Sequence, residues 1–178
     1  MQADERRKGI GFSGGAHDMK TALRLLLCAA MLLCLAGCVR KADISAYGDA
    51  LITVSGLLDE DFTVTPNELA ALECVSRTAV GATAKAGTVR AYGPLLDTFL
   101  ARYGYSASDF YKIRFLCADE YKVVLRDEYL TDYEIVMAVA YRDGPLPEEM
   151  RPLRLLIPEA ESSKWAYAVT RIEFERTP

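Results

Sequence analysis

The stretch YRDGPLPEEMRPLRLLIPEAESSKW, residues 141–165, has the most distinctive pattern in this chain. Residues 142–145 (RDGP) predict a turn, because Gly and Pro interrupt regular structure. The apolar run 153–157 is closed by Pro158 and predicts a short buried strand. Lys164-Trp165 then comes just before a final apolar segment. The stretch therefore predicts a turn, a loop and a strand in quick succession.

Outward from this stretch, short apolar segments alternate with turn signals along most of the chain. Thr65 is an expected helix N-cap, with Pro66 as the first helical residue and Glu68 completing a capping box. The expected strands are 51–57, 62–65, 72–80, 88–91, 112–117, 121–125, 133–141, 153–157, and 165–169 with 172–174 as a pair or one bent strand. The expected helical segments are 66–71, 94–103, 106–111 and 127–131, with a turn as the alternative for 127–131 and a helix as the alternative to the strand at 133–141. Many short strands with a few short helices predict an α+β fold with mixed β-sheets.

The composition is that of a globular protein, with 178 residues of which 51% are hydrophobic and 26% are charged. Disorder is excluded because the apolar content is high and the charges are mixed. The formal net charge is −4. An acidic chain lacks the basic surface that binds phosphate backbones, so we expect no nucleic-acid partner.

The first part of the chain predicts the compartment. Residues 1–18 are polar and Gly-rich, and we expect them to be an upstream extension with Met19 as the native start. Residues 19–37 combine a short basic start with the apolar run 25–36, which is typical of a signal peptide. As a helix this run spans about 18 Å, less than the roughly 30 Å of bilayer hydrocarbon, which disfavours a membrane-spanning segment.

The apolar run ends in Leu35-Ala36-Gly37-Cys38, which resembles the lipobox of bacterial lipoproteins. The resemblance implies cleavage before Cys38 and attachment of acyl chains such as palmitate to that residue. Two or three acyl chains anchor a protein firmly in a membrane. We therefore expect a lipoprotein of the bacterial cell envelope, anchored through Cys38, with 38–50 as a lipidated tether and 51–178 as a single domain outside the cytoplasm.

Removal of the leader would also remove His17, the only histidine in the chain. Without imidazole the domain has no His-based nucleophilic triad, no His-dependent zinc site and no His general base. Two cysteines, Cys74 and Cys117, lie beyond the lipidated one. Three interpretations stay open for them: a disulfide between Cys74 and Cys117, two buried thiols, or a ligand role for Cys74.

From about residue 62 to residue 174 the chain resembles the sulfite-oxidase-like molybdopterin-binding domain in a short bacterial form. The resemblance rests on residues 141–165, on YGPLL at 92–96 and on CADEY at 117–121. It implies the α+β fold of that family and a molybdenum cofactor, whose metal takes a Cys thiolate and whose phosphate is held by cations. By position it implies Cys74 as the metal ligand and Arg77, Arg154 and Lys164 as cofactor-binding residues.

The chain departs from this family at its site. It has Cys74-Val75-Ser76-Arg77 where the family's enzymes usually have Cys-x-Gly-Asn-Arg, and it has no imidazole for the pterin pocket. A lipoprotein signal also implies export of an unfolded chain, whereas molybdopterin proteins are usually exported folded. We therefore expect no bound cofactor and a non-catalytic binding or structural module, with an envelope protein or small ligand as partner. The alternative is a molybdopterin-dependent oxidoreductase with Cys74 as molybdenum ligand.

Overall fold

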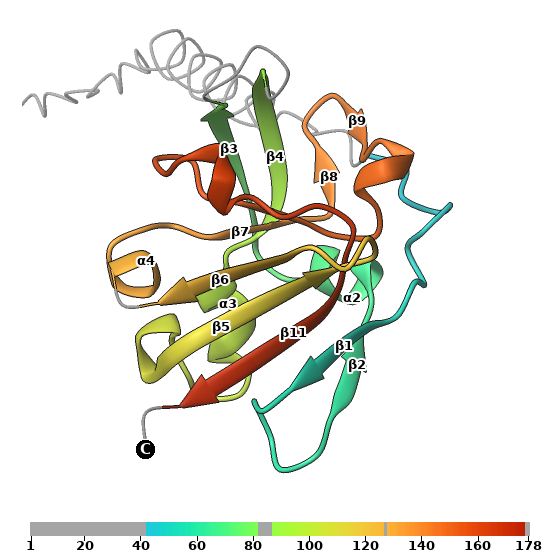
Figure 1. Cartoon of the computed structure of the whole chain (residues 1–178). Coiled ribbons are helices and arrows are strands. Elements are labelled where there is room, and N and C mark those ends of the chain that lie inside the picture. Colours follow the sequence, from blue (N-terminus) through green and yellow to red (C-terminus); the bar gives the residue numbers. More distant parts are fainter. Residues whose placement is uncertain (1–41, 82–86, 127, 177–178) are drawn as a thin grey trace, which may run out of the picture. The chain divides into compact units, whose positions relative to one another are not determined.

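The computed structural model describes residues 42–81, 87–126 and 128–176, all within one compact unit, Lys41–Pro178. The predictions for residues 1–18, for 19–37 and for Cys38 lie outside these residues. The described chain forms three sheets (Figure 1), with strand orders β2-β1-β11-β5-β6, β3-β4-β8-β9 and β10-β7. Strands β1 and β11 are parallel and every other pair is antiparallel, which confirms the predicted α+β fold with mixed sheets.

The element bounds agree with most of the predicted segments. The strands are β1 (Ile52–Ser55), β2 (Phe62–Val64), β3 (Cys74–Val80), β4 (Thr88–Pro94), β5 (Phe110–Cys117), β6 (Lys122–Arg126), β7 (Val136–Ala138), β8 (Ala140–Tyr141), β9 (Gly144–Pro145), β10 (Arg154–Leu156) and β11 (Val169–Arg176). The α-helices are α2 (Pro66–Ala70), α3 (Leu96–Ala101) and α4 (Glu128–Thr131), and the 3-10 turns are η1 (Ala107–Asp109), η2 (Glu148–Met150) and η3 (Ser162–Lys164).

One face of the five-stranded sheet forms a wall of the core. Val54, Ile172, Phe115 and Val123 lie side by side across β1, β11, β5 and β6, and all four are buried. Helix α3 lies behind this sheet in Figure 1 and contributes buried apolar side chains to the same core cluster. Side chains alternate between the two faces of a strand, so the residues next to these four along each strand point to the outer face.

The outer face of this sheet carries charged side chains that pair with one another. Figure 1 shows this face toward the viewer. The ion pairs are Lys112–Glu175 at 2.5 Å, Arg114–Glu175 at 3.0 Å, Arg114–Glu173 at 3.2 Å, Arg171–Glu173 at 3.1 Å and Arg171–Asp61 at 3.3 Å. The hydrogen bond from Lys112 lowers the pKa of Glu175. Each of the three cations on this face, Lys112, Arg114 and Arg171, therefore has a carboxylate partner.

Two of the predicted strands differ from the structure. The run 133–141 is divided at Val139, because β7 pairs with β10 whereas β8 pairs with β4. Such a continuous apolar run has no alternation that would reveal the change of sheet. Residues 165–168 precede the last strand, which is a single β11 with a register shift between Val169 and Arg171. The predicted turn 142–145 contains β9.

The predicted capping box at α2 is present. The backbone N–H of Glu68 donates to Thr65 Oγ1 at 3.2 Å, and the backbone N–H of Thr65 donates to Glu68 Oε2 at 2.7 Å.

Residues 42–50, which the sequence assigned to the tether, pack on the domain. The Tyr47 hydroxyl donates to the Val139 carbonyl at 2.7 Å and accepts from the Leu146 N–H at 2.9 Å.

Candidate functional site

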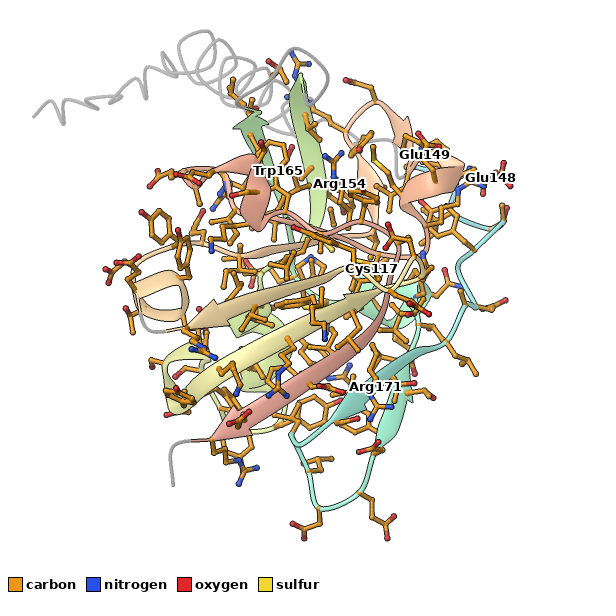
Figure 2. The ribbon with its side chains drawn as sticks, viewed as in Figure 1. Cys117, Glu148, Glu149, Arg154, Trp165 and Arg171 are labelled. Carbon is orange, nitrogen blue, oxygen red and sulfur yellow. The ribbon has the colours of Figure 1, made fainter. Side chains whose placement is uncertain are left out.

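Arg154 is a buried cation at the start of β10, with 5% of its surface exposed. Its Nη1 donates to the Tyr141 hydroxyl and, at 3.1 Å, to the Met150 sulfur. Its guanidinium lies 5.6 Å from the ring centroid of Tyr141 and also 5.6 Å from that of Trp165. Figure 2 shows Arg154 beside Trp165, away from Arg171 on the five-stranded sheet. Two aromatic rings and a thioether therefore surround this guanidinium.

The Arg154 guanidinium retains an unused donor. Among the described residues it forms no ion pair, and its Nε is buried without a hydrogen-bond partner. A buried donor without a partner costs about 1–3 kcal/mol. Burial raises the pKa of Tyr141, and the Arg154 charge offsets part of that rise. The cluster of Arg154, Tyr141, Met150 and Trp165 can thus offer a hydrogen-bond donor and a positive charge to an anionic group.

Cys74 lies at the start of β3 and is half-buried. Its thiol lies 3.8 Å from the carbonyl oxygen of Leu69 and 3.9 Å from that of Ala70, near the end of α2, and donates toward both. Tyr92 is its neighbour on β4: burial first, and the Cys74 thiol second, raise the pKa of Tyr92. The thiol therefore belongs to a contact between α2 and the four-stranded sheet.

The strand register places Cys74 and the Arg154 cluster on opposite faces of the four-stranded sheet. Cys74 lies opposite Pro94 of β4, and Tyr141 lies opposite Ala91 of the same strand. Pro94 and Ala91 are three positions apart, so their side chains point to opposite faces. Cys74 consequently points away from the face that Tyr141 and its partner Arg154 occupy.

Arg77 lies on the same face of the four-stranded sheet as Tyr141, and the carboxylate of Glu134 holds it. Its Nε donates to Glu134 at 2.6 Å and its Nη2 donates to the other carboxylate oxygen at 2.9 Å. This hydrogen bonding lowers the pKa of Glu134 and raises that of Arg77. Arg77 is thus neutralised by a two-point ion pair.

Lys164 and Cys117 lie in two further environments. The Lys164 ammonium lies in η3, 4.9 Å from the ring centroid of Tyr129. Cys117 ends β5 in the core, and burial raises the pKa of its thiol. No disulfide joins Cys74 to Cys117, and of the two thiols Cys117 is buried whereas Cys74 is half-buried. The predicted site residues therefore do not form one cluster.

A molybdenum cofactor needs a metal ligand and phosphate-holding cations around one cavity. Cys74 points away from Arg154, and Arg77 is paired with Glu134. The residues present do not fit a metal centre ligated by Cys74, whereas the buried Arg154 retains a donor suited to an anion.

The sequence identified Arg154 but not the side chains that surround it. Tyr141 and Met150 lie in the stretch 141–165, yet nothing in their spacing from Arg154 reveals a contact. Tyr92 was part of the YGPLL motif, and its position beside Cys74 depends on strand pairing. Only the strand register, which a single sequence does not contain, brings these residues together.

Comparison with known proteins gives one family and one fold. A model of the oxidoreductase molybdopterin binding domain matches residues 43–178. The sulfane dehydrogenase SoxCD of Paracoccus pantotrophus matches 78% of this chain with a TM-score of 0.59 and 17% identity, and the match covers 40% of that chain. No curated protein matches the sequence. Among the described residues, no helix has the length and apolar character needed to span a membrane.

Proposed function

This chain belongs to the oxidoreductase molybdopterin binding domain family, and we propose that its role departs from the cofactor chemistry of that family. It is a membrane-anchored lipoprotein whose domain serves as a non-catalytic binding module of the bacterial cell envelope. Its anchor is lipid on Cys38, and its partner is an envelope protein or a small ligand. The domain has the sulfite-oxidase-like fold of its family.

The placement of Cys74 supports this proposal most strongly. A metal ligand and the cations that hold the cofactor phosphate must converge on one cavity. Here Cys74 and Arg154 lie on opposite faces of the four-stranded sheet, and the thiol donates toward helix carbonyls. Moving the thiol to the other face would require a one-residue slip of β3, which would also turn Ala79 out of the core.

Arg154 is the residue through which the module contacts its ligand. It is buried, carries a charge without a carboxylate partner among the described residues, and has an unused Nε donor. Buried charges are usually paired, because desolvation of a lone charge is costly. An anionic group on the ligand would supply the missing partner.

The second candidate is a molybdopterin-dependent oxidoreductase with Cys74 as molybdenum ligand. The unused Arg154 donor favours it too, since a pterin phosphate is one such anion. When bound, the cofactor would supply two-electron redox chemistry. Arg154 would bind the phosphate in that case, and the metal would require a ligand arrangement different from the one described.

Both parts of the proposal can be tested on the full chain produced in a bacterium with an intact molybdopterin pathway. Oxidation of the purified protein converts a bound pterin into a fluorescent derivative, and we expect no such fluorescence. Cys38→Ser should abolish incorporation of radiolabelled palmitate into the protein, with Cys34→Ser as the matched control that keeps it. Stoichiometric pterin would overturn the non-catalytic role, and palmitate incorporation in Cys38→Ser equal to that of the unchanged chain would overturn the anchor.

A further inference from the structure

Strand β3 has an outer edge without a partner strand among the described residues. The other edges of the two larger sheets are protected by short length, proline or charge, as is common in soluble proteins. β2 has three residues, β9 has two and ends in Pro145, and β6 has exposed Lys122 and Arg126 at its ends. β3 has seven residues and one charged side chain, Arg77, which is paired with Glu134.

A hollow of about 310 Å³ lies against this edge. Arg77 and Thr78 both line it, although consecutive side chains of a strand point to opposite faces. No residue of β4, the inner neighbour of β3, lines it. The hollow therefore lies beside the outer edge of β3, where an added strand would place its own side chains.

The hollow carries an excess of negative charge. Its other lining residues are Asp132, Glu134, Pro158 and Glu159, so three carboxylates face one guanidinium. Glu134 pairs with Arg77, and Asp132 accepts from the Thr131 hydroxyl at 2.9 Å. Glu159 forms no ion pair with any described residue. A basic side chain is the complement of this surface.

We infer that the outer edge of β3 binds an extended peptide segment of a partner protein that carries Lys or Arg. The segment adds as a further strand, its backbone pairs with β3, and a basic side chain enters the hollow. This inference goes beyond the module proposed above, because it concerns a different surface from the Arg154 cluster and depends neither on Cys38 nor on a cofactor.

A second copy of this chain is a poorer occupant of the same edge. Antiparallel pairing of β3 with its own copy about Arg77 would bring two guanidinium groups opposite each other and two acidic hollows together. Like charges directly opposite each other on paired strands are destabilising. A basic segment of another protein avoids both repulsions.

The probes are three fluorescent heptapeptides, tested against the full chain in detergent by fluorescence anisotropy. The first alternates Thr and Lys, the second has Glu in place of Lys, and the third is the Lys peptide with N-methyl groups on alternate backbone amides. We expect only the first to bind, and hydrogen exchange should show new protection in β3. Each opposite-charge pair across strands gives about a fivefold change in affinity.

Two surface variants test the role of the hollow. Glu159→Gln should weaken binding of the Lys peptide about fivefold, because it removes one carboxylate from the hollow. Glu148→Gln is the matched control, since Glu148 is an exposed glutamate on η2 that does not line the hollow. Neither change affects a buried side chain, so both variants should fold.

Four outcomes of the peptide-binding assays would overturn the inference. These are no binding by any of the peptides, equal binding of the Lys and Glu peptides, undiminished binding of the N-methylated peptide, and equal effects of the two variants. A dimer of the full chain with protected β3 amides in the absence of peptide would also overturn it, because a second copy would then be the occupant. None of these results bears on pterin content or on the anchor.

Discussion

Two regions of the molecule differ in what their buried or half-buried cations do. On the outer face of the five-stranded sheet, Lys112, Arg114 and Arg171 each pair with a carboxylate. Beside the four-stranded sheet, Arg154 is buried without a carboxylate partner among the described residues. The first arrangement stabilises a solvated face, whereas the second keeps a cation and a donor available. The comparison supports the proposal that Arg154 contacts a ligand.

The largest expected effect comes from the core face of the five-stranded sheet. Phe115 is fully buried at its centre, and Phe115→Ala should lower the free energy of unfolding by about 3–5 kcal/mol. Val89→Ala on the core face of the four-stranded sheet removes two methyl groups and should cost about 1.5 kcal/mol. Urea unfolding of the two variants measures both values. Equal losses would contradict the deeper burial of the larger Phe115 side chain.

The two cysteines give the next effect, because they belong to the two different sheets. Cys74 is half-buried, whereas Cys117 is buried in the core and has a raised thiol pKa. Alkylation requires the thiolate, so Cys74 should react with iodoacetamide about tenfold faster. Peptide mapping by mass spectrometry resolves the two sites in the full chain. Faster labelling of Cys117, or a peptide joining the two cysteines, would contradict the structure.

Replacing Arg154 tests whether it is kept for binding rather than for stability. Arg154→Met retains an unbranched side chain in contact with Tyr141 and Trp165 and removes a buried charge that lacks a carboxylate. Such replacements are often neutral or stabilising, so we expect the free energy of unfolding to rise by about 1 kcal/mol. Arg114→Met is the control, because Arg114 is paired with Glu173 and Glu175, and it should not raise the free energy of unfolding. A loss of more than about 2 kcal/mol in Arg154→Met would show that this arginine is structural.

The smallest effect concerns the Arg77–Glu134 pair. Arg77 lowers the pKa of Glu134 below its usual 4.5 in the folded state. The pair therefore adds stability above the unfolded pKa, and this stability is lost as the pH falls through the folded value. Both groups are exposed, so the contribution is about 0.5 kcal/mol or less.

An NMR titration of the Glu134 carboxyl measures this pair directly. Arg77→Gln should return the pKa of Glu134 toward 4.5. Arg90→Gln, which removes a cation 3.9 Å from Asp143, is the control and should leave the pKa of Glu134 unchanged. An unchanged pKa of Glu134 in Arg77→Gln would contradict Arg77 as the cause of the lowered value.

Local signals in the sequence predicted most of the fold. The capping box at Thr65 and the hairpin of β5 and β6 depend on neighbouring residues, so a single sequence contains them. The division of residues 133–141 into β7 and β8 depends on pairing with β10 and β4, which are far away in the chain. Local pattern carries no information on such pairing.

The candidate site was predictable only in part, for the same reason. Motif position identified Arg154, but its burial between Tyr141 and Trp165 depends on strand packing. Cys74 was assigned beside Arg154 from its order in the chain, whereas the register of β3 on β4 places it on the other face. A shift of one residue reverses the face of every side chain in a strand, so only the structure decides this question.

Molybdenum content tests the central claim most directly. The full chain would be purified from cells with an intact cofactor pathway and analysed by inductively coupled plasma mass spectrometry, alongside Cys74→Ser. We expect a molybdenum level at background in both proteins, because the thiol and Arg154 do not face one cavity. About one molybdenum atom per chain that disappears in Cys74→Ser would contradict the account.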